Sequence, residues 1–184
     1  TFLQNQDAAG LESKMAWYRW RCEISLTVLQ ELFSKRLPIL QSEQGNSIQI
    51  NGVSLETVIG STLKSVQVTG RFAGGMASGL QLNYEAGTIQ VAGELVIRRL
   101  LGEPNRTYQN KSEKGISISE GDYLPSAFFC LVPLTKEEKL TGYVICGGGN
   151  GHGIGLSQNA AYVLLQQGKK WQEILSFFYQ GIAF

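Results

Sequence analysis

Residues 146–161 read CGGGNGHGIGLSQNAA and join an apolar segment of strand type to a helical segment through a run of glycines. Glycine loses more backbone freedom on folding than any other residue, so such a run is costly unless the backbone needs it. The usual need is close approach of the backbone to a ligand. We therefore expect a binding site in residues 147–155, called here the glycine-rich loop, which contains His152, the only histidine of the chain.

The segments around this loop predict an α+β fold with antiparallel strands and segregated short helices. Alternation of apolar residues, bounded by glycine, indicates strands, whereas apolar spacing of three and four indicates helices. The absence of alternating βαβ units argues against a parallel sheet. Strands are predicted at 17–24, around 66–68, 80–84 and 89–91, and at 126–133 and 140–146; helices are predicted at 26–33, 94–101, 156–167 and 171–179.

Several local features sharpen these predictions. Ser25 is expected to cap the first helix and Pro38 to stop it. Gly168 is expected at the end of the third predicted helix. Residues 1–16 are expected to form a flexible leader or linker, 41–52 an exposed hairpin or loop, and 102–122 a polar loop. The buried face of the last helix is expected to carry Trp171, Ile174, Leu175 and Phe178.

Composition limits the possible partners. The chain has 184 residues, of which 43% are hydrophobic, so one domain with a real core, or at most two small ones, can form without disulfides. Its 16 Lys and Arg are scattered among 15 Asp and Glu, giving a net charge of +1, so nucleic acid is not an expected partner. Cys22, Cys130 and Cys146 show no metal-ligand spacing and are expected to be small buried hydrophobes.

The ends and apolar runs of the chain lead to a further expectation. The apolar runs are far shorter than the roughly 20 residues that span a bilayer. The chain begins with Thr1 and has no signal-like apolar region. We therefore expect it to be a piece of a longer protein.

The glycine spacing argues against phosphate-binding loops. Glycines at 149, 151, 153 and 155 are two residues apart, which does not fit G-x-G-x-x-G, and Gly168 does not belong to a Walker A loop. Ser157 lies between Leu156 and Gln158, so no G-x-S-x-G nucleophile motif is present. We expect Ser157 to cap the following helix, with a nucleophilic role as the lesser alternative.

His152 is the most specific candidate for ligand contact. A helix N-terminus disfavours the imidazolium, so we expect a neutral imidazole that acts as a hydrogen-bonding group. The amide side chains of Asn150, Gln158 and Asn159 are near it in sequence. Neutral donors and acceptors over a glycine floor suit an uncharged, hydroxyl-rich ligand such as a sugar. No carboxylate adjoins this loop in sequence, so an acid for chemistry on a glycosidic bond would fold in from elsewhere or be missing from this chain. Glu94, Glu103, Asp122 and Glu173 are expected in solvated surface positions.

A longer pattern resembles a known family. The run Gly149-Asn150-Gly151-His152-Gly153-Ile154-Gly155-Leu156-Ser157-Gln158-Asn159-Ala160-Ala161, followed by Gly168, Glu173-Ile174-Leu175 and Phe178-Tyr179-Gln180-Gly181, resembles the C-terminal region of the stage II sporulation protein D (SpoIID) family, also called the LytB amidase-enhancer family. Weaker similarity covers Tyr18-Arg19-Trp20, Gly93-Glu94 with Ile97-Arg98 and Leu100, and Leu124-Pro125-Ser126 with Phe128. Leu156 and Asn159-Ala160-Ala161 depart mildly from the family pattern.

The resemblance implies a peptidoglycan lytic transglycosylase that acts on peptide-stripped glycan strands during septum remodelling and engulfment in sporulation. It implies an extracytoplasmic protein anchored by an N-terminal membrane helix outside this chain, and partners that include a cell-wall amidase and membrane sporulation proteins. Residues 17–184 would be the C-terminal domain. The family's catalytic glutamate, and zinc where present, belong to upstream segments that this sequence lacks, so no cofactor is expected within the chain.

The expected ligand is a peptidoglycan glycan strand, and the expected contacts come from the glycine-rich loop and the start of the next helix. Two classes remain open: an enzyme whose catalytic residue lies outside this chain, and a noncatalytic module that binds the cell wall or enhances an amidase. The expected substrate-binding residues are Gly151, His152, Gly153, Gly155, Ser157 and Gln158, acting on sugar directly or by orienting the catalytic glutamate.

Overall fold

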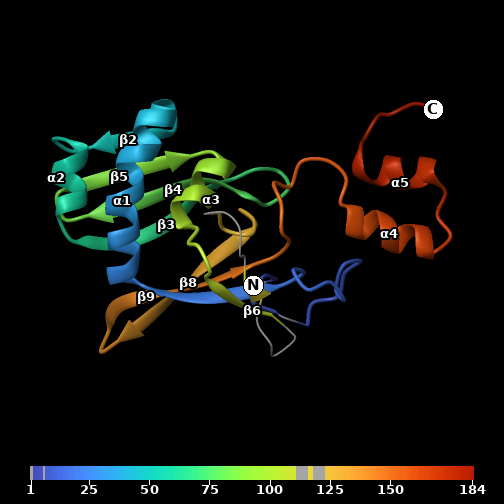
Figure 1. Cartoon of the computed structure of the whole chain (residues 1–184), viewed down its shortest axis with the longest axis horizontal. Helices are drawn as coiled ribbons and strands as arrows, with labels where there is room; N and C mark the ends of the chain where they lie inside the picture. The colour runs from blue at the N-terminus through green and yellow to red at the C-terminus, as the bar shows by residue number, and fades with distance from the viewer. Residues whose placement is uncertain (1, 6, 111–115, 118–122) are drawn as a thin grey trace.

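The computed structural model describes residues 2–5, 7–110, 116–117 and 123–184, and the predicted α+β class is confirmed (Figure 1). All strand pairings within the described residues are antiparallel. The strands are β1 Trp20–Ser25, β2 Ile48–Asn51, β3 Leu63–Arg71, β4 Ala77–Tyr84, β5 Gly87–Ala92, β6 Thr107–Asn110, β7 Ile116–Ser117, β8 Phe129–Lys136 and β9 Lys139–Gly147. The helices are α1 Leu26–Gln44, α2 Leu55–Gly60, α3 Glu94–Leu101, α4 Gln158–Gln166 and α5 Trp171–Phe178.

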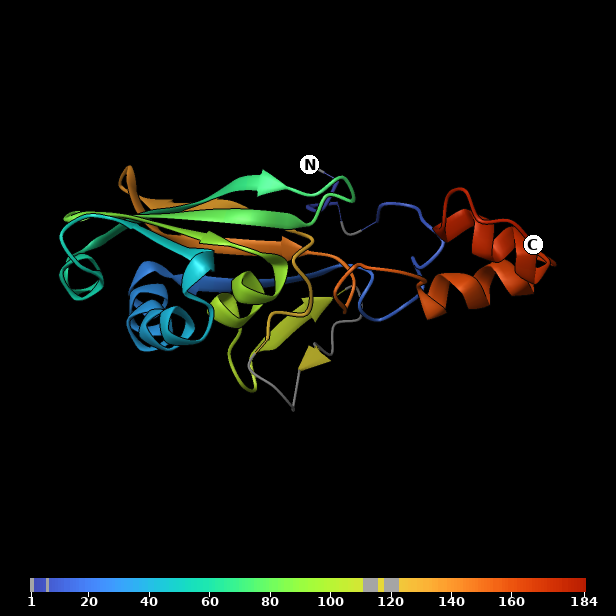
Figure 2. The ribbon, with the colours of Figure 1, turned by 90° about the horizontal axis from the view of Figure 1, so that it is seen from above.

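Two sheets form the body of the molecule. One has the strand order β7-β6-β1-β9-β8 and the other has the order β2-β5-β4-β3. A hydrogen bond links them, because the backbone N–H of Val66 on β3 donates to the hydroxyl of Tyr143 on β9 at 2.9 Å. Helices α1 and α3 contact each other and lie on one side of the sheets (Figure 2). One continuous hydrophobic core therefore fills the body.

Strand β1 shows the expected alternation. Trp20, Cys22 and Ile24 are buried, and the residues between them are exposed. The strand is central in its sheet, since β9 pairs with one edge and β6 with the other. The strand was predicted to begin at residue 17, but it begins at Trp20. The Trp17 carbonyl instead accepts a hydrogen bond from the Gly149 N–H.

Helix α1 contradicts the prediction that Pro38 ends it. The Ser25 side chain caps the helix as expected, but the helix continues to Gln44 with Pro38 inside it. Its buried stripe continues past the proline through Leu37 and Leu40. Burial of these side chains favours the helical path, and it offsets the lost backbone hydrogen bond of proline.

Three other segments differ from what the sequence predicted. Residues 41–52 are neither a hairpin nor one loop, because they include the end of α1, a 3-10 turn at Gly45–Ser47 and strand β2. Helix α2 was not predicted from its six residues. Residues 102–122 were expected to be a loop, yet β6 and β7 lie within them; residues 111–115 and 118–122 of that loop lie outside the described residues.

Helices α4 and α5 lie apart from the sheets and form what we call the C-terminal lobe, residues 158–184 (Figures 1 and 2). Both helices were predicted, but the buried face of α5 was only partly correct. Ile174 is buried, whereas Trp171 is 58% exposed and packs edge-on against Phe184. None of the described helices combines the length and apolar character needed to cross a bilayer.

The three cysteines are free thiols, and Cys22 and Cys146 are buried as predicted, whereas Cys130 is partly exposed. Burial raises the pKa of the Cys22 thiol to about 11. Cys130 and Cys146 are opposite each other on β8 and β9. A hydrogen bond with Cys130, together with burial, raises the pKa of Cys146. Buried thiols of this kind stay protonated and unreactive at neutral pH.

Replacement of Pro38 tests the account of α1. Pro38 is exposed, so Pro38→Ala removes no core packing and restores a backbone donor inside the helix. We expect the free energy of unfolding to rise by about 1 to 3 kcal/mol, as measured by urea denaturation followed by circular dichroism. Pro133→Ala is the control, because Pro133 is exposed on the edge strand β8 and should change stability little. A loss of stability in Pro38→Ala would contradict the account.

Candidate functional site

The glycine-rich loop is fixed first by Trp20. A Cβ atom on Gly147 would lie 2.2 Å from the Trp20 ring, so only glycine allows the fully buried indole to pack there. The indole Nε1–H also donates to the carbonyl of Gly149 at 2.9 Å. The Gly149 N–H in turn donates to the carbonyl of Trp17 at 2.7 Å. The segment that leads into β1 therefore holds the beginning of the loop.

A second set of hydrogen bonds joins the loop to residues 125–128. The Ser126 hydroxyl donates to the Gly148 carbonyl at 2.6 Å and accepts from the Phe128 N–H at 3.1 Å. The Gly148 N–H donates to the Phe128 carbonyl at 3.0 Å, and the Gly151 N–H donates to the Pro125 carbonyl at 2.9 Å. These bonds satisfy the polar backbone of an irregular segment.

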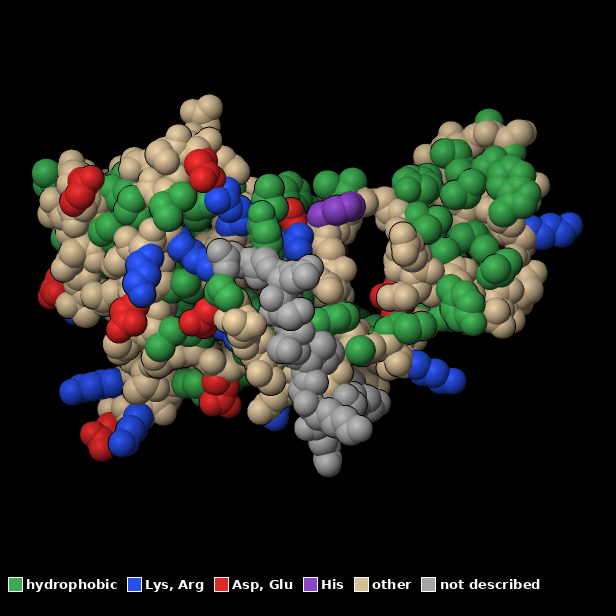
Figure 3. All heavy atoms as spheres, viewed as in Figure 1, with side chains coloured by type: hydrophobic (Ala, Val, Ile, Leu, Met, Phe, Trp, Pro, Cys, Tyr) green, Lys and Arg blue, Asp and Glu red, His purple; other side chains and the backbone are tan. Residues whose placement is uncertain are grey.

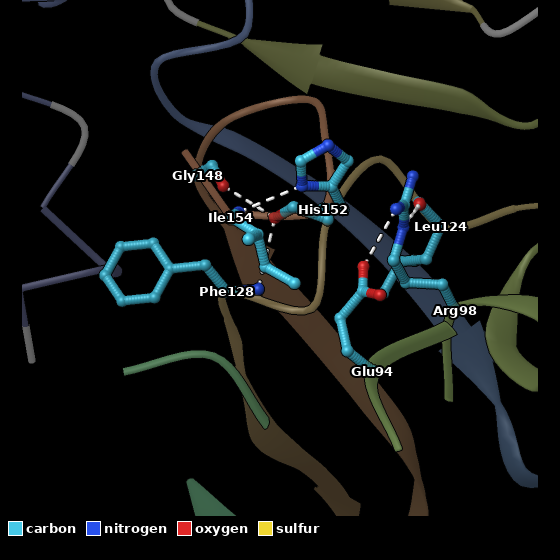
Figure 4. A network of polar contacts seen from close by, with 8 residues as sticks. Glu94, Arg98, Leu124, Phe128, Gly148, His152 and Ile154 are labelled. Atoms are coloured by element: carbon cyan, nitrogen blue, oxygen red, sulfur yellow. Dashed lines mark hydrogen bonds and ion pairs between the residues drawn. The ribbon is translucent and has the colours of Figure 1, made fainter. Parts of the chain in front are cut away.

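Helix α3 binds the residue just before this segment, Leu124, through Arg98 (Figure 4). Arg98 forms an ion pair with Glu94 at 2.8 Å, and its Nε donates to the Leu124 carbonyl at 2.8 Å. The Leu124 N–H donates back to the Arg98 carbonyl at 2.9 Å. The side chains of Glu94 and Arg98 are only 15% and 13% exposed. Glu94 was expected to be solvated, and this expectation was wrong, because its carboxylate orients the arginine that holds the site.

The other carboxylates expected to be solvated differ in their contacts. Glu103 forms an ion pair with Arg106 at 2.7 Å, in which its own side chain is 44% exposed. Glu173 accepts hydrogen bonds from the Lys170 N–H and from Lys169, and these contacts lower its pKa. Its side chain is 48% exposed. Asp122 lies outside the described residues. Among the described ones, Glu94, Glu103 and Glu173 do not line the groove defined below.

Backbone geometry explains the glycines further along the loop. Gly149, Gly153 and Gly155 have φ values of 76°, 70° and 95°, a region that other residues rarely adopt. At Gly153 a Cβ atom would also lie 1.9 Å from the sulfur of Met76. The loop therefore requires glycine for its conformation and, at Gly153, for its packing.

His152 is exposed, and its ring position is set by a local hydrogen bond. Its Nδ1 accepts from the Ile154 N–H at 2.9 Å, as Figure 4 shows. An amide N–H only donates, so Nδ1 carries no proton and the neutral ring carries its proton on Nε2. Nε2 has no partner among the described residues, so its N–H is available to an acceptor on a ligand.

Ser157 caps helix α4 as predicted, but it does so together with a carboxylate that was not predicted. Its Oγ accepts from the Ala160 N–H at 3.3 Å and donates to Oε1 of Glu12. The same Oε1 accepts from the Ala160 N–H at 3.1 Å. No carboxylate is near the loop in sequence, and the structure shows one, Glu12, folding in beside it from a distant segment. The glutamate is 145 residues away in sequence, so local spacing gave no signal of the contact.

These elements enclose a groove of about 700 Å³, a volume in the usual range for ligand sites. Figure 3 shows the molecule hollowed beside His152, between the body and the C-terminal lobe. All six expected substrate-binding residues line it: Gly151, His152, Gly153, Gly155, Ser157 and Gln158. Other lining residues include Phe2, Glu12, Met15, Trp17, Tyr18, Arg19, Met76, Ser126, Phe128, Asn150 and Asn159.

Residues before β1 provide one wall of the groove, although they were expected to be a flexible leader or linker. Leu3 and Ala8 are buried, and Glu12 makes the contacts with helix α4 described above. Arg19 is only 4% exposed. Its guanidinium lies 4.1 Å from the centres of the Phe2 and Tyr18 rings. Within the described residues, no group of three or more His, Cys, Asp or Glu is arranged to hold a metal ion.

The groove offers mainly neutral chemistry. Its donors and acceptors are backbone amides, the His152 imidazole, the amides of Gln158 and its neighbours, and hydroxyls. Its one acid among the described lining residues is Glu12, and its one permanent cation is Arg19. Such a set suits recognition of a hydroxyl-rich ligand that also carries negative charge.

Comparison with known proteins assigns the chain to a family. A model described as a domain of unknown function, DUF8618, matches residues 1–155. The chain belongs to this family. The matched range includes the glycine-rich loop and Glu12 and ends before the C-terminal lobe.

An uncharacterized protein of the bacterium Brachyspira hyodysenteriae is also similar to the chain. The two are 46% identical over 68 residues, which cover 35% of the chain and 18% of the relative. The chain thus spans much less than two thirds of this relative's length. No solved structure matches the chain.

The Trp20 hydrogen bond can be tested by Trp20→Phe. We expect a loss of about 1 to 3 kcal/mol in the free energy of unfolding, because the Gly149 carbonyl loses its buried donor and the ring loses volume. Trp17→Phe is the matched control, since Trp17 and Trp20 both pack edge-on against Tyr108, but Trp17 is only partly buried. Equal losses in urea denaturation would contradict the assigned role of Trp20.

The contact between Glu12 and helix α4 can be tested by Glu12→Ala. We expect the Ala160 amide to exchange with deuterium roughly two- to thirtyfold faster, because the helix loses part of its cap. Glu31→Ala, at an exposed position of α1, should leave that rate unchanged. Unchanged exchange in Glu12→Ala would show that Ser157 alone caps the helix.

Proposed function

We propose that the groove binds the glycan strand of peptidoglycan and that the chain forms one wall of a lytic transglycosylase. The observation that carries this proposal is the convergence of all six expected residues on one groove of ligand size. The resemblance of residues 149–161 to the SpoIID and LytB family supports it. Peptide-stripped strands in the sporulation septum are the proposed substrate.

The chemistry of the groove suits a sugar polymer. His152 offers an Nε2–H donor, and Gln158 and Asn159 offer amide donors and acceptors from exposed positions. Trp17 and Phe128 line the same groove and present apolar ring surface. Sugar rings combine hydroxyl groups with apolar C–H faces, so both kinds of contact are useful.

The reaction requires an acid that protonates the glycosidic oxygen. The same group then accepts the proton of the C6 hydroxyl, so that the sugar closes to a 1,6-anhydro end without water. Glu12 is a poor candidate for this acid, because its Oε1 accepts from two donors and serves as a helix cap. We therefore assign catalysis to a glutamate outside this chain and substrate positioning to His152 and Gln158.

The second candidate is a noncatalytic module that binds the cell wall or enhances an amidase. The engagement of Glu12 in helix capping also favours this candidate, since it leaves the groove without a free acid among its described lining residues. In both cases we propose an extracytoplasmic location, a membrane anchor outside this chain, and a cell-wall amidase and membrane sporulation proteins as partners. Any zinc site is likewise assigned to a segment outside the chain.

Binding of peptide-free glycan strands by the chain tests the shared part of both candidates. We expect His152→Ala and Gln158→Ala each to weaken binding about two- to tenfold in isothermal titration calorimetry, because each removes a neutral hydrogen bond. Gln166→Ala, at an exposed position of α4 that does not line the groove, should bind as the unmodified chain does. Unchanged binding in both groove variants would show that the loop has only a structural role.

Digestion separates the two candidates. The intact protein should release fragments with 1,6-anhydro ends from peptide-free strands, as detected by mass spectrometry. Binding without anhydro products at high protein concentration would favour the noncatalytic module. Absence of binding would contradict the transglycosylase and the wall-binding module.

A further inference from the structure

Arg19 has hydrogen-bonding capacity that the protein does not use. The residue is only 4% exposed, and its Nη1 donates to the Tyr18 carbonyl at 2.6 Å. Its Nε and Nη2 are buried and have no hydrogen-bond partner among the described residues. Arg19 nevertheless lines the groove that also contains His152 and Gln158.

A buried guanidinium without a carboxylate is an expensive arrangement. Removal of an ion from water is strongly unfavourable unless an opposite charge and hydrogen bonds compensate for it. Arg19 has the faces of two aromatic rings and one carbonyl, and burial lowers its pKa. Aromatic faces recover part of this cost, but they leave the donors on the edge of the guanidinium unsatisfied.

The two Arg19 nitrogens without a partner indicate which chemical group a ligand would carry. Nε and Nη2 lie on the same edge of a planar guanidinium, and their N–H groups point in parallel. This geometry allows bidentate hydrogen bonds to the two oxygens of a carboxylate. The Phe2 ring lies 4.1 Å above one face of the guanidinium, lines the same groove and is itself 55% exposed. The ring covers one face of the guanidinium, whereas Nε and Nη2 lie on its edge.

We propose that Arg19 is a carboxylate-binding subsite of the groove and that it takes the lactyl carboxylate of muramic acid in peptide-stripped glycan. This inference rests on the proposed function. An amidase adds water across the amide bond between the lactyl group and the stem peptide, which leaves a carboxylate on the sugar and an amine on the peptide. An intact stem peptide presents a neutral amide at that point instead. Arg19 thus makes the groove select strands after amidase action.

The test uses two glycan tetrasaccharides of alternating N-acetylglucosamine and N-acetylmuramic acid. One carries free lactyl carboxylates, and in the other these are converted to methylamides. We expect the unmodified chain to bind the carboxylate form roughly tenfold more tightly or better, as measured by isothermal titration calorimetry, because the charged bidentate contact is absent from the methylamide.

Substitutions test whether Arg19 is responsible for the preference for the carboxylate form. Arg19→Lys keeps the charge but loses the two-pronged contact, so we expect the preference to fall to a few-fold. Arg21→Lys is the matched control, because Arg21 is exposed on β1 and its Nε donates to Gln109. It should keep the full preference. Phe2→Ala should keep the preference too, since it removes a ring from one face of the guanidinium and leaves both edge donors in place.

The outcomes separate the inference from the function on which it rests. Equal binding of both tetrasaccharides by the unmodified chain would overturn the Arg19 subsite and leave the proposed glycan groove standing. No binding of either would overturn the proposed function itself. Full preference in a folded Arg19→Lys variant would also contradict the inference, and thermal melting checks that the variant is folded. If that variant does not fold, the comparison of the two sugars by the unmodified chain still decides.

Discussion

The indole of Trp20 occupies the space that a side chain at residue 147 would need, and its N–H binds the carbonyl of residue 149. This contact joins the central strand β1 to the point where β9 becomes the glycine-rich loop. Every later position of the loop depends on it, because the loop leaves the sheet at the place and in the direction that the indole allows. The bonds from Ser126 and Pro125 then fix the same backbone from the opposite side.

The groove is assembled from parts of the chain that are far apart in sequence. The glycine-rich loop gives its floor, the residues before β1 give one wall, and the start of α4 gives another. Glu12 crosses between the two walls, whereas Arg19 lies under the first wall with its free donors buried. A largely neutral surface thus contains one acid and one permanent cation among its described lining residues, and the two have different roles. The acid is used by the protein itself, and the cation is left to a ligand.

Much of the fold could be predicted from the sequence because its cues are local. Alternation in β1, β4 and β5, the amphipathic spacing of α3, and the caps at Ser25 and Ser157 act over a few residues. The path of α1 through Pro38 could not be predicted, since burial of later leucines outweighs a local helix-breaking preference. In the candidate site, too, only the features with local cues could be predicted. The six expected residues are close in sequence, whereas Glu12 and the burial of Arg19 depend on tertiary packing alone.

The contact between Glu12 and the cap of α4 has a consequence for how the molecule orders itself. Coupling between two segments is reciprocal: the free energy by which residue 12 steadies the helix equals that by which the helix steadies the segment around residue 12. Ordering of this early segment and positioning of the C-terminal lobe are thus linked equilibria. A ligand that contacts only one wall of the groove would therefore also order the other wall. Ligand binding would then reduce the motion of both the segment around residue 12 and the C-terminal lobe.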